Sequence, residues 1–405
     1  MNKEDFPIFN NYKNEHNKEL VYLDSASSSQ TPQIVIDAMT NFYTHIRSNI
    51  DRSSHSLGAR ATETYENTRR EVASFLGSED NQEIIFTGGS TLASNIIFQM
   101  FAEKLSLKEG DIIVSSIMEH HSVLVPLLEI TKKYKCELKL IPLDGVNLDY
   151  KKAEEIIDDK TKLVVVTLAS NVLGIINDVN RISDIAHRHN AFVVADGTAY
   201  IGHKKIDVKT LGADSLFFSG HKMCGPTGVG VIWMRRDILR FMKPVIFGGG
   251  MVAEVFKDEA FYRSDVKVFE AGTQNISGVI GLGESLKYLE KIGLENIFKH
   301  TKEITKYLIE KLKEIDGIKI FTEENIEKNI GIVSFAFDGV HPHDVAEILG
   351  RNHISVRGGH HCAEPLVKSL GENSLTRISI YLYNTKEDID ILIEGLKEVK
   401  KVFHS

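Results

Sequence analysis

A lysine among glycines and hydroxyls is the feature of this sequence that most directly indicates chemistry. The run S-L-F-F-S-G-H-K-M-C-G-P-T-G-V-G occupies residues 215–230 and places Lys222 shortly after the apolar residues 216–218. A buried lysine binds its proton less tightly, so its amine can attack a carbonyl and form a Schiff base. The glycines let backbone N–H groups approach an anion, and Ser219 and His221 add side-chain donors. The alternative is a tight turn with an exposed lysine.

A cysteine in a polar loop is the second reactive group. Cys362 lies in R-G-G-H-H-C-A-E-P, residues 357–365, beside His360, His361 and Arg357. Positive neighbours and access to solvent lower the pKa of a thiol and make it nucleophilic. A structural cysteine would normally lie in an apolar run instead. The surroundings therefore predict a reactive thiol.

An aspartate and a histidine follow two expected strands. Asp196 ends the apolar run 191–195, where a buried carboxylate needs a partner such as a protonated ring nitrogen. His120 lies just past the expected strand 111–116, at the edge where open α/β sheets bind ligands. A solvated loop histidine is the alternative there.

A glycine turn after another strand is typical of an anion site. Residues 84–86 indicate a strand, 87–90 a turn and Thr91 the start of a helix. The free N–H groups and the dipole of such a helix point at the same place, which favours a phosphate. A turn of this composition can equally be a plain connection.

Two arginines complete the set of candidate residues. Arg357 and Arg377 each lie next to an expected strand, and a guanidinium can hold a carboxylate through two hydrogen bonds. A surface ion pair is the alternative. A Schiff-base lysine, an aspartate for a ring nitrogen, a phosphate cradle, a carboxylate clamp and a thiol together indicate pyridoxal 5'-phosphate (PLP) chemistry on an amino acid.

Strands alternate with helices through the first part of the chain. This alternation predicts an α/β fold with a largely parallel sheet covered by helices on both faces. The pattern loosens after residue 235, where 248–261 is expected to be a loop and 269–275 a polar turn. Expected strands at 318–321, 331–337 and 354–356 and a closing amphipathic helix at 388–403 predict a smaller α+β domain.

The composition is that of an ordinary globular protein, with 405 residues, of which 42% are hydrophobic and 26% charged. That length favours two domains. The net charge of −8 and the absence of a long basic run argue against a nucleic-acid surface. The sequence contains no run of about 18 apolar residues, so we expect no membrane span. The N-terminus has no apolar stretch typical of a secretory signal. Three scattered cysteines predict neither a disulfide framework nor a metal site. We expect a cytoplasmic protein.

Eight motifs carry a resemblance to a known family. The chain resembles the class V aminotransferase-like enzymes of PLP fold-type I, and within them the SUF-type (group II) cysteine desulfurases. The motifs are Y-L-D-S-A (22–26), M-E-H-H (118–121), S-N-V-L-G (170–174), V-A-D-G (194–197), S-G-H-K-x-x-G-P-T-G (219–228), F-E-A-G-T (269–273), R-x-G-H-H-C-A (357–363) and Y-N-T (383–385).

The resemblance implies a domain arrangement. A large domain over residues 21–285 would hold PLP on a mostly parallel seven-stranded sheet between helices. A smaller α+β domain over 286–405 would carry the cysteine loop. Residues 1–20 would form an N-terminal arm that packs with the small domain.

The resemblance also implies catalytic roles. Lys222 would carry PLP and move the α-proton of L-cysteine, and His120 would stack on the cofactor ring. Cys362 would attack the substrate sulfur, leaving L-alanine and a persulfide on the enzyme. The short interval from Arg357 to Cys362 implies a restrained loop that depends on a SUF-type acceptor protein to collect the sulfur, which serves iron–sulfur cluster assembly in this group.

The remaining implied residues bind cofactor or substrate. The cofactor set is Lys222, Asp196, His120, Ser90, Thr91, Asn171, Ser219, His221 and, across the interface of a homodimer, Thr273. The substrate set is Arg377, Arg357, Asn171 and His55.

Four positions depart from the family pattern. Ala199 stands where the family has a glutamine that reaches the PLP ring oxygen, and Leu92 stands where it has a glutamate. Asp51 replaces a histidine and Gln274 a proline. The departures keep other readings open: a selenocysteine lyase, another class V lyase, epimerase or transaminase, or a weakly active homologue that acts as a partner protein.

Overall fold

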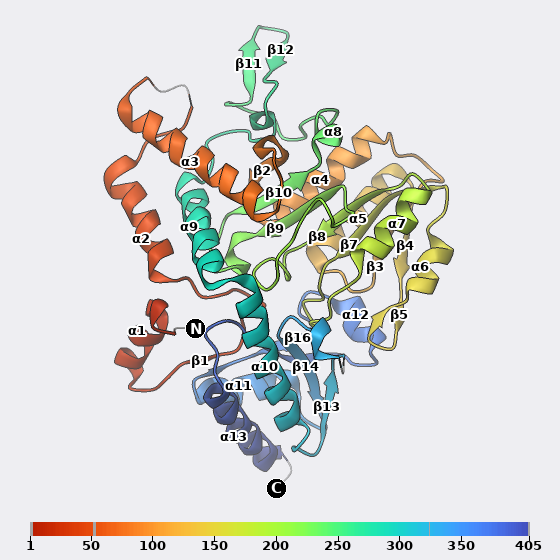
Figure 1. Cartoon of the computed structure of the whole chain (residues 1–405). Helices are drawn as coiled ribbons and strands as arrows, with labels where there is room; N and C mark the ends of the chain where they lie inside the picture. The colour runs from red at the N-terminus through yellow and green to blue at the C-terminus, as the bar shows by residue number, and fades with distance from the viewer. Residues whose placement is uncertain (1–2, 52–53, 324, 404–405) are drawn as a thin grey trace.

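A seven-stranded sheet forms the centre of the molecule in a computed structural model that describes residues 3–51, 54–323 and 325–403 (Figure 1). β10 pairs antiparallel with both of its neighbours and the other pairings are parallel, so the predicted α/β fold with a mostly parallel sheet is confirmed. The strands, in sheet order, are β2 (Ile84–Thr87), β10 (Gly230–Met234), β9 (Ser215–Ser219), β8 (Phe192–Asp196), β7 (Thr161–Thr167), β3 (Ile112–Ser116) and β4 (Glu137–Ile141).

Helices cover both faces of this sheet, as its continuous apolar strands require. Successive residues of β9 show the division: Phe217 packs on Phe98 of α4, with ring centroids 6.3 Å apart, whereas Phe218 belongs to the core of the opposite face. One face carries α4 (Ser90–Lys104), α5 (His121–Tyr134) and α8 (Arg236–Leu239). The other carries α3 (Ser56–Phe75), α6 (Tyr150–Ile156), α7 (Val179–Arg188) and α9 (Ile276–Ile292).

A second, antiparallel sheet of four strands lies below the first in Figure 1 and has its own core. Its strands, in sheet order, are β13 (Ile318–Phe321), β14 (Ile332–Phe337), β17 (Leu375–Ser379) and β16 (Arg357–Gly359). The helices after α9 are α10 (Leu294–Leu312), α11 (Pro342–Arg351), α12 (Glu364–Ser369) and α13 (Lys386–Phe403).

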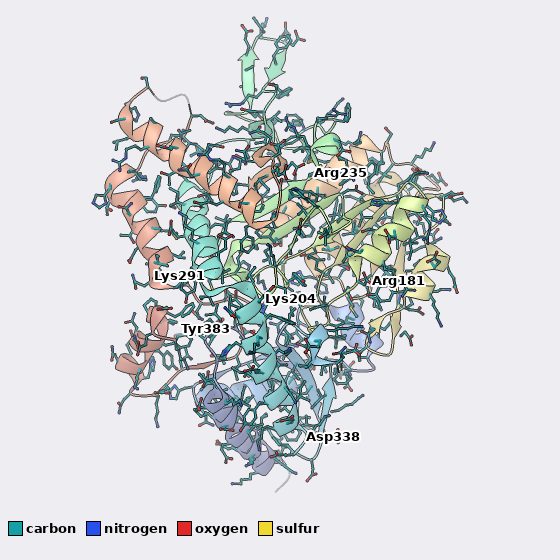
Figure 2. The ribbon with its side chains drawn as sticks, in the orientation of Figure 1. Arg181, Lys204, Arg235, Lys291, Asp338 and Tyr383 are labelled. Atoms are coloured by element: carbon teal, nitrogen blue, oxygen red, sulfur yellow. The ribbon has the colours of Figure 1, made fainter. Side chains whose placement is uncertain are left out.

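The first part of the chain packs against residues near its end. β1 (Val21–Tyr22) pairs in parallel with β15 (Ile354–Ser355). Helix α1 (Pro7–His16) precedes β1, and its Phe9 packs on Tyr383 with ring centroids 5.3 Å apart. Phe6, just before this helix, also packs on Tyr383, at 5.0 Å. Figure 2 shows Tyr383 close to the short α1.

The remaining elements are α2 (Gln33–Asn41), β5 (Leu143–Asp144) and β6 (Asn147–Leu148), with a π-helix at Phe42–Ile46. No helix within the described residues is both long and apolar enough to span a bilayer.

The prediction of a loop over 248–261 is wrong. β11 (Val252–Val255) and β12 (Ala260–Tyr262) form an antiparallel hairpin that projects from the top of the molecule (Figure 1). No residue of either strand is buried. The sequence of this segment therefore lacks the alternation of apolar and polar residues that would predict a strand. Helix α9 packs closely on α3, where a side chain at Gly283 would meet Thr68.

Candidate active site

One cavity of about 680 Å³ collects most of the predicted site residues. It lies at the carboxyl ends of the parallel strands, where the loop before β17 meets them. The predicted residues that line it are Ser90, Thr91, His120, Asn171, Asp196, Ser219, His221, Lys222, Arg357, Cys362 and Arg377. His55 and Thr273 are not among the residues that line this cavity, and their proposed roles stay predictions.

Lys222 ends a short turn that follows β9. Its Nζ donates to the backbone oxygen of Ala26 and, at 2.9 Å, to that of Ser27. Burial, followed by the nearby positive charge of Arg377, lowers the pKa of Lys222 to about 8. An amine with this pKa is partly unprotonated near neutral pH, as Schiff-base chemistry requires.

Asp196 is the last residue of β8 and is 3% exposed. Its Oδ1 accepts a hydrogen bond from the backbone N–H of Thr198 at 2.8 Å, and no cationic side chain of the described residues lies within ion-pair distance. Burial raises its pKa, and the hydrogen bonds from Thr198 oppose the shift. A buried carboxylate that faces a cavity without a cation of its own fits the protonated ring nitrogen of PLP.

The start of α4 fits a phosphate. The first hydrogen bond of this helix runs from the N–H of Ala93 to the oxygen of Gly89, so the N–H groups of Thr91 and Leu92 are free of that ladder. Gly89 has a φ of +136°, a conformation that L side chains rarely adopt. Ser90 Oγ bonds with Thr198 Oγ1 at 2.9 Å, on the cavity wall. Free N–H groups at a positive dipole end bind anions.

Two histidines of the cavity are uncharged at neutral pH. Burial and the charge of Lys222 lower the pKa of His120 and of His221 to about 4. His120 caps α5, where its Nδ1 accepts from the N–H of Ser122 at 3.0 Å. Because Nδ1 accepts, the hydrogen of this ring lies on Nε2. His120 is therefore a neutral, fixed ring on the cavity wall, as a stacking role requires.

The two arginines share one carboxylate. Arg377 on β17 is 2% exposed, and its Nη2 donates to Asp24 at 3.1 Å and its Nη1 to the oxygen of Asn171 at 2.9 Å. Arg357 on β16, its cross-strand partner, donates from Nη2 to the same Asp24 at 2.8 Å. Arg377 Nε has no hydrogen-bond partner among the described residues. A guanidinium with a free buried donor in a cavity can receive a further carboxylate.

Cys362 is exposed, whereas Cys224 is buried and Cys136 half-buried. His361 and Cys362 both have a φ of +54°, and the Cys362 oxygen accepts from the N–H of His121 at 2.6 Å. One part of the prediction for this thiol is wrong: burial lowers the pKa of His361 to about 3, so that ring carries no positive charge.

Asp24 is the site residue that sequence reasoning missed. It appeared only as a letter in a motif, although it organises both arginines. A carboxylate immediately after a short apolar strand was the available signal, of the same kind that pointed to Asp196. Within the described residues, no three His, Cys, Asp or Glu side chains are grouped to bind a metal ion.

Comparisons with known proteins agree with this geometry. The family model described as "Aminotransferase class-V" matches residues 21–392. A "Probable cysteine desulfurase" of Halalkalibacterium halodurans is 43% identical over 98% of this chain and 97% of its own, and one of Staphylococcus aureus is 43% identical over 98% and 96%.

Solved structures show the same relationship. A cysteine desulfurase of Thermococcus onnurineus superposes with a TM-score of 0.92 at 37% identity, covering 99% of this chain and 97% of its own. The cysteine desulfurase CsdA of Escherichia coli gives 0.91 at 32% identity, covering 99% and 98%. The chain is thus a member of the class V aminotransferase family of PLP-dependent enzymes and, within that family, of the cysteine desulfurases.

Proposed function

We propose that this protein removes sulfur from L-cysteine and holds it as a persulfide on Cys362 for a SUF-type acceptor protein. The observation that carries the proposal is that Cys362, Lys222, Asp196 and Arg377 line one cavity. Bound PLP would withdraw electrons from the substrate carbon that it holds.

The residues that would hold the cofactor surround the cavity. The amine of Lys222 would bind it, Asp196 would face its ring nitrogen, and His120 would cover the ring. The N–H groups at the start of α4, with Ser90, Thr91, Ser219 and His221, would hold its phosphate. Asn171, whose Nδ2 donates to the oxygen of His361 at 2.8 Å, would join the cofactor side to the cysteine loop.

The chain's own groups would carry out the transfer. Arg377, with its free Nε, would bind the substrate carboxylate, helped by Arg357. Lys222 would take the α-proton and return it. The Cys362 thiolate would attack the substrate sulfur, so that an S–S bond forms as the C–S bond breaks. The electron pair of the broken bond stays on the carbon skeleton, which leaves as L-alanine after protonation.

A homodimer is part of the proposal. The hairpin carries Val255, Phe256, Phe261 and Tyr262, whose side chains are 44–62% exposed. A second copy would cover these side chains, and its Thr273 would reach the cavity of this chain. Three unpaired cysteines suit the reducing cytoplasm. Delivery of the sulfur to iron–sulfur cluster assembly belongs to the same proposal.

Asp51, one of the departures from the family pattern, forms ion pairs. Asp51 accepts a hydrogen bond from Lys267 and lies 3.9 Å from Arg263. Lys267 also pairs with Glu66 of α3 at 3.1 Å. These contacts join Asp51 and α3 to the segment that leads to Thr273.

The test is alanine and sulfide formation from L-cysteine by the purified protein with a reductant. We expect yellow protein and both products, loss of both and of the colour in Lys222→Ala, and retained colour without sulfide in Cys362→Ser. Cys136→Ser is the matched control and should behave as wild type. A coloured Cys362→Ser that desulfurates at the wild-type rate would overturn the role of this thiol.

Other outcomes identify the alternatives. Yellow wild-type protein that makes no alanine, even with an acceptor protein, would indicate the weakly active homologue. Turnover of selenocysteine alone, insensitive to Cys362→Ser, would indicate a selenocysteine lyase. Products from other amino acids or keto acids would indicate another class V activity.

A further inference from the structure

Two buried oxygens beside Thr167 lack donors. Glu119 is fully buried, and its Oε1 accepts from Ser116 Oγ at 2.5 Å and from the N–H of Thr167 at 3.0 Å. Its Oε2 has no hydrogen-bond partner among the described residues, and neither has Oδ1 of Asn177, which is 5% exposed. A buried acceptor without a donor is costly. Two such acceptors around one residue therefore call for a physical cause.

The backbone of Thr167 brings the two side chains to the same place. The N–H and C=O of one strand residue face the same side of the strand. Glu119 accepts from that N–H, and Asn177 Nδ2 donates to that C=O at 2.9 Å. The latter bond also fixes the Asn177 amide, because a flipped amide would set two carbonyl oxygens against each other. The unpartnered oxygens of Glu119 and Asn177 thus lie on one side of the end of β7.

We propose that Glu119 is held as a neutral carboxylic acid whose Oε2–H donates to Asn177 Oδ1, and that this proton leaves Asp196 as the one negatively charged member of the two carboxyl groups. A single hydrogen then satisfies both orphaned oxygens. Glu119 acts through Asp196 and is a positioning residue. The inference about its effect on turnover rests on the proposed role of Asp196, whereas the protonation state itself does not.

The position of Asp196 explains why only one carboxyl group is ionised. Thr167, which donates to Glu119, is the cross-strand partner of Asp196 on β7 and β8. The carboxyl groups of Glu119 and Asp196 are both buried. Two carboxylates that interact in a poorly solvated site cannot both ionise readily, so one keeps a proton.

Asp196 has the better support for a charge. It accepts from Thr198 and feels the positive charge of Lys222, which lowers its pKa against the effect of burial. Glu119 follows β3, which β7 separates from the strand of Asp196, and no cation contributes to the pKa of Glu119. Burial first, and then the charge of Asp196, raises the pKa of Glu119 to about 8.

The decisive variant is Glu119→Gln, which places an N–H donor where we propose an O–H. In infrared difference spectra of the apo-protein at neutral pH, the wild type should show the C=O stretch of a buried protonated acid, and Glu119→Gln should lack it. The band should titrate away near pH 8. Because the folded protein holds this proton to a higher pH than the unfolded chain, wild-type unfolding free energy should fall between pH 5 and about 8 relative to Glu119→Gln.

Glu83→Gln is the matched control. Both oxygens of Glu83 accept from protein donors, Trp233 Nε1 and the N–H of Arg236, each at 2.8 Å. In Glu83→Gln, the amide N–H₂ would face one of these two protein donors. This variant should therefore lower the denaturation midpoint at pH 6, whereas Glu119→Gln should leave that midpoint unchanged. Glu119→Ala, which leaves the N–H of Thr167 without its acceptor, should lower it, and glutamine should restore it.

A functional readout tests the link to Asp196. In the holoenzyme, the alkaline limb of the pH profile of kcat should move to higher pH in Glu119→Gln, because no second carboxylate forms beside Asp196. An unmoved limb would overturn that link. No acid band in the wild type, with Glu119→Gln as destabilised at pH 6 as Glu83→Gln, would overturn the neutral acid itself. If the protein shows the acid band but has no desulfurase activity, the neutral state of Glu119 is supported and only the proposed function is overturned.

Discussion

Arg377 donates to Asp24 at 3.1 Å across 353 positions of the chain. The same carboxylate receives Arg357, so one aspartate orients the two arginines that we assign to the substrate. Arg377 is 2% exposed, and the rest of its guanidinium faces Asn171 and the cavity. Asp24 is therefore the group that compensates a buried positive charge.

Asp24→Asn should destabilise the apo-protein strongly. Removing one partner of a buried ion pair costs about 3–5 kcal/mol, because the remaining charge stays buried. Urea denaturation measures the loss. The control is Arg357→Gln: its side chain is 47% exposed, and removing it should cost less than about 1 kcal/mol. Equal losses in the two variants would contradict the role of Asp24.

The capture of PLP by apo-protein should follow the ionisation of Lys222. A lysine whose pKa is lowered to about 8 is protonated below that pH and a free amine above it. The rate constant for PLP binding, followed by visible absorbance, should rise about tenfold from pH 7 to pH 9 and then level off. A rate that keeps rising past pH 10 would indicate an ordinary, solvated lysine.

Alkylation should distinguish the three cysteines. Cys362 is exposed, whereas burial raises the pKa of Cys224 to about 12 and also raises that of Cys136. Mass spectrometry after brief treatment with iodoacetamide should find Cys362 modified at least about tenfold faster than the others, with Cys224 modified only in denatured protein. Sulfide release should fall in proportion to the fraction of Cys362 that is alkylated. Faster modification of Cys136 would refute this order.

The hairpin should control dimerisation. The Phe256 and Phe261 rings, 6.0 Å apart, are 53% and 48% exposed. Changing both to serine should shift the protein toward monomer in sedimentation velocity, and PLP should then dissociate faster because Thr273 of the second copy is lost. Lys257→Ser, on the same hairpin, is the polar control. If both proteins dimerise as the wild type does, the hairpin does not form the interface.

Ala199→Gln should tighten PLP binding. Ala199 lines the cavity of about 680 Å³, which leaves room for a longer side chain at this wall. An amide there can donate to a charged cofactor oxygen, which is worth roughly 1.5 kcal/mol, so PLP should dissociate about tenfold more slowly. Ala199→Leu adds similar bulk without a donor and should bring no gain. An equal gain from leucine would assign the effect to packing.

The fold and the reactive residues were accessible from sequence for a physical reason. Strands buried on both faces are continuous apolar runs, and polar residues at their carboxyl ends, such as Asp196 and Ser219, lie where ligands bind. Lys222 and Cys362 stood out because each lies in a glycine-bearing polar loop.

Other features depend on contacts that no local pattern records. The link between Asp24 and Arg377 joins distant segments. The loss of charge on His361 follows from burial of its ring, which contacts the Leu375 oxygen of β17 at 3.0 Å. The hairpin has no buried face and so no hydrophobic period. Glu119 was visible only as a letter between two strands until its donors were known.

The pairing of β1 with β15 has a consequence for the order of events during protein synthesis. Val21 is synthesised more than 300 residues before its strand partner Ile354. The separation between Asp24 and Arg377 is larger, at 353 positions. A nascent chain can build the Lys222 side of the cavity while the arginines and Cys362 are still untranslated. If Cys362 and Arg377 have the roles that we propose, sulfur removal cannot begin until translation has almost ended.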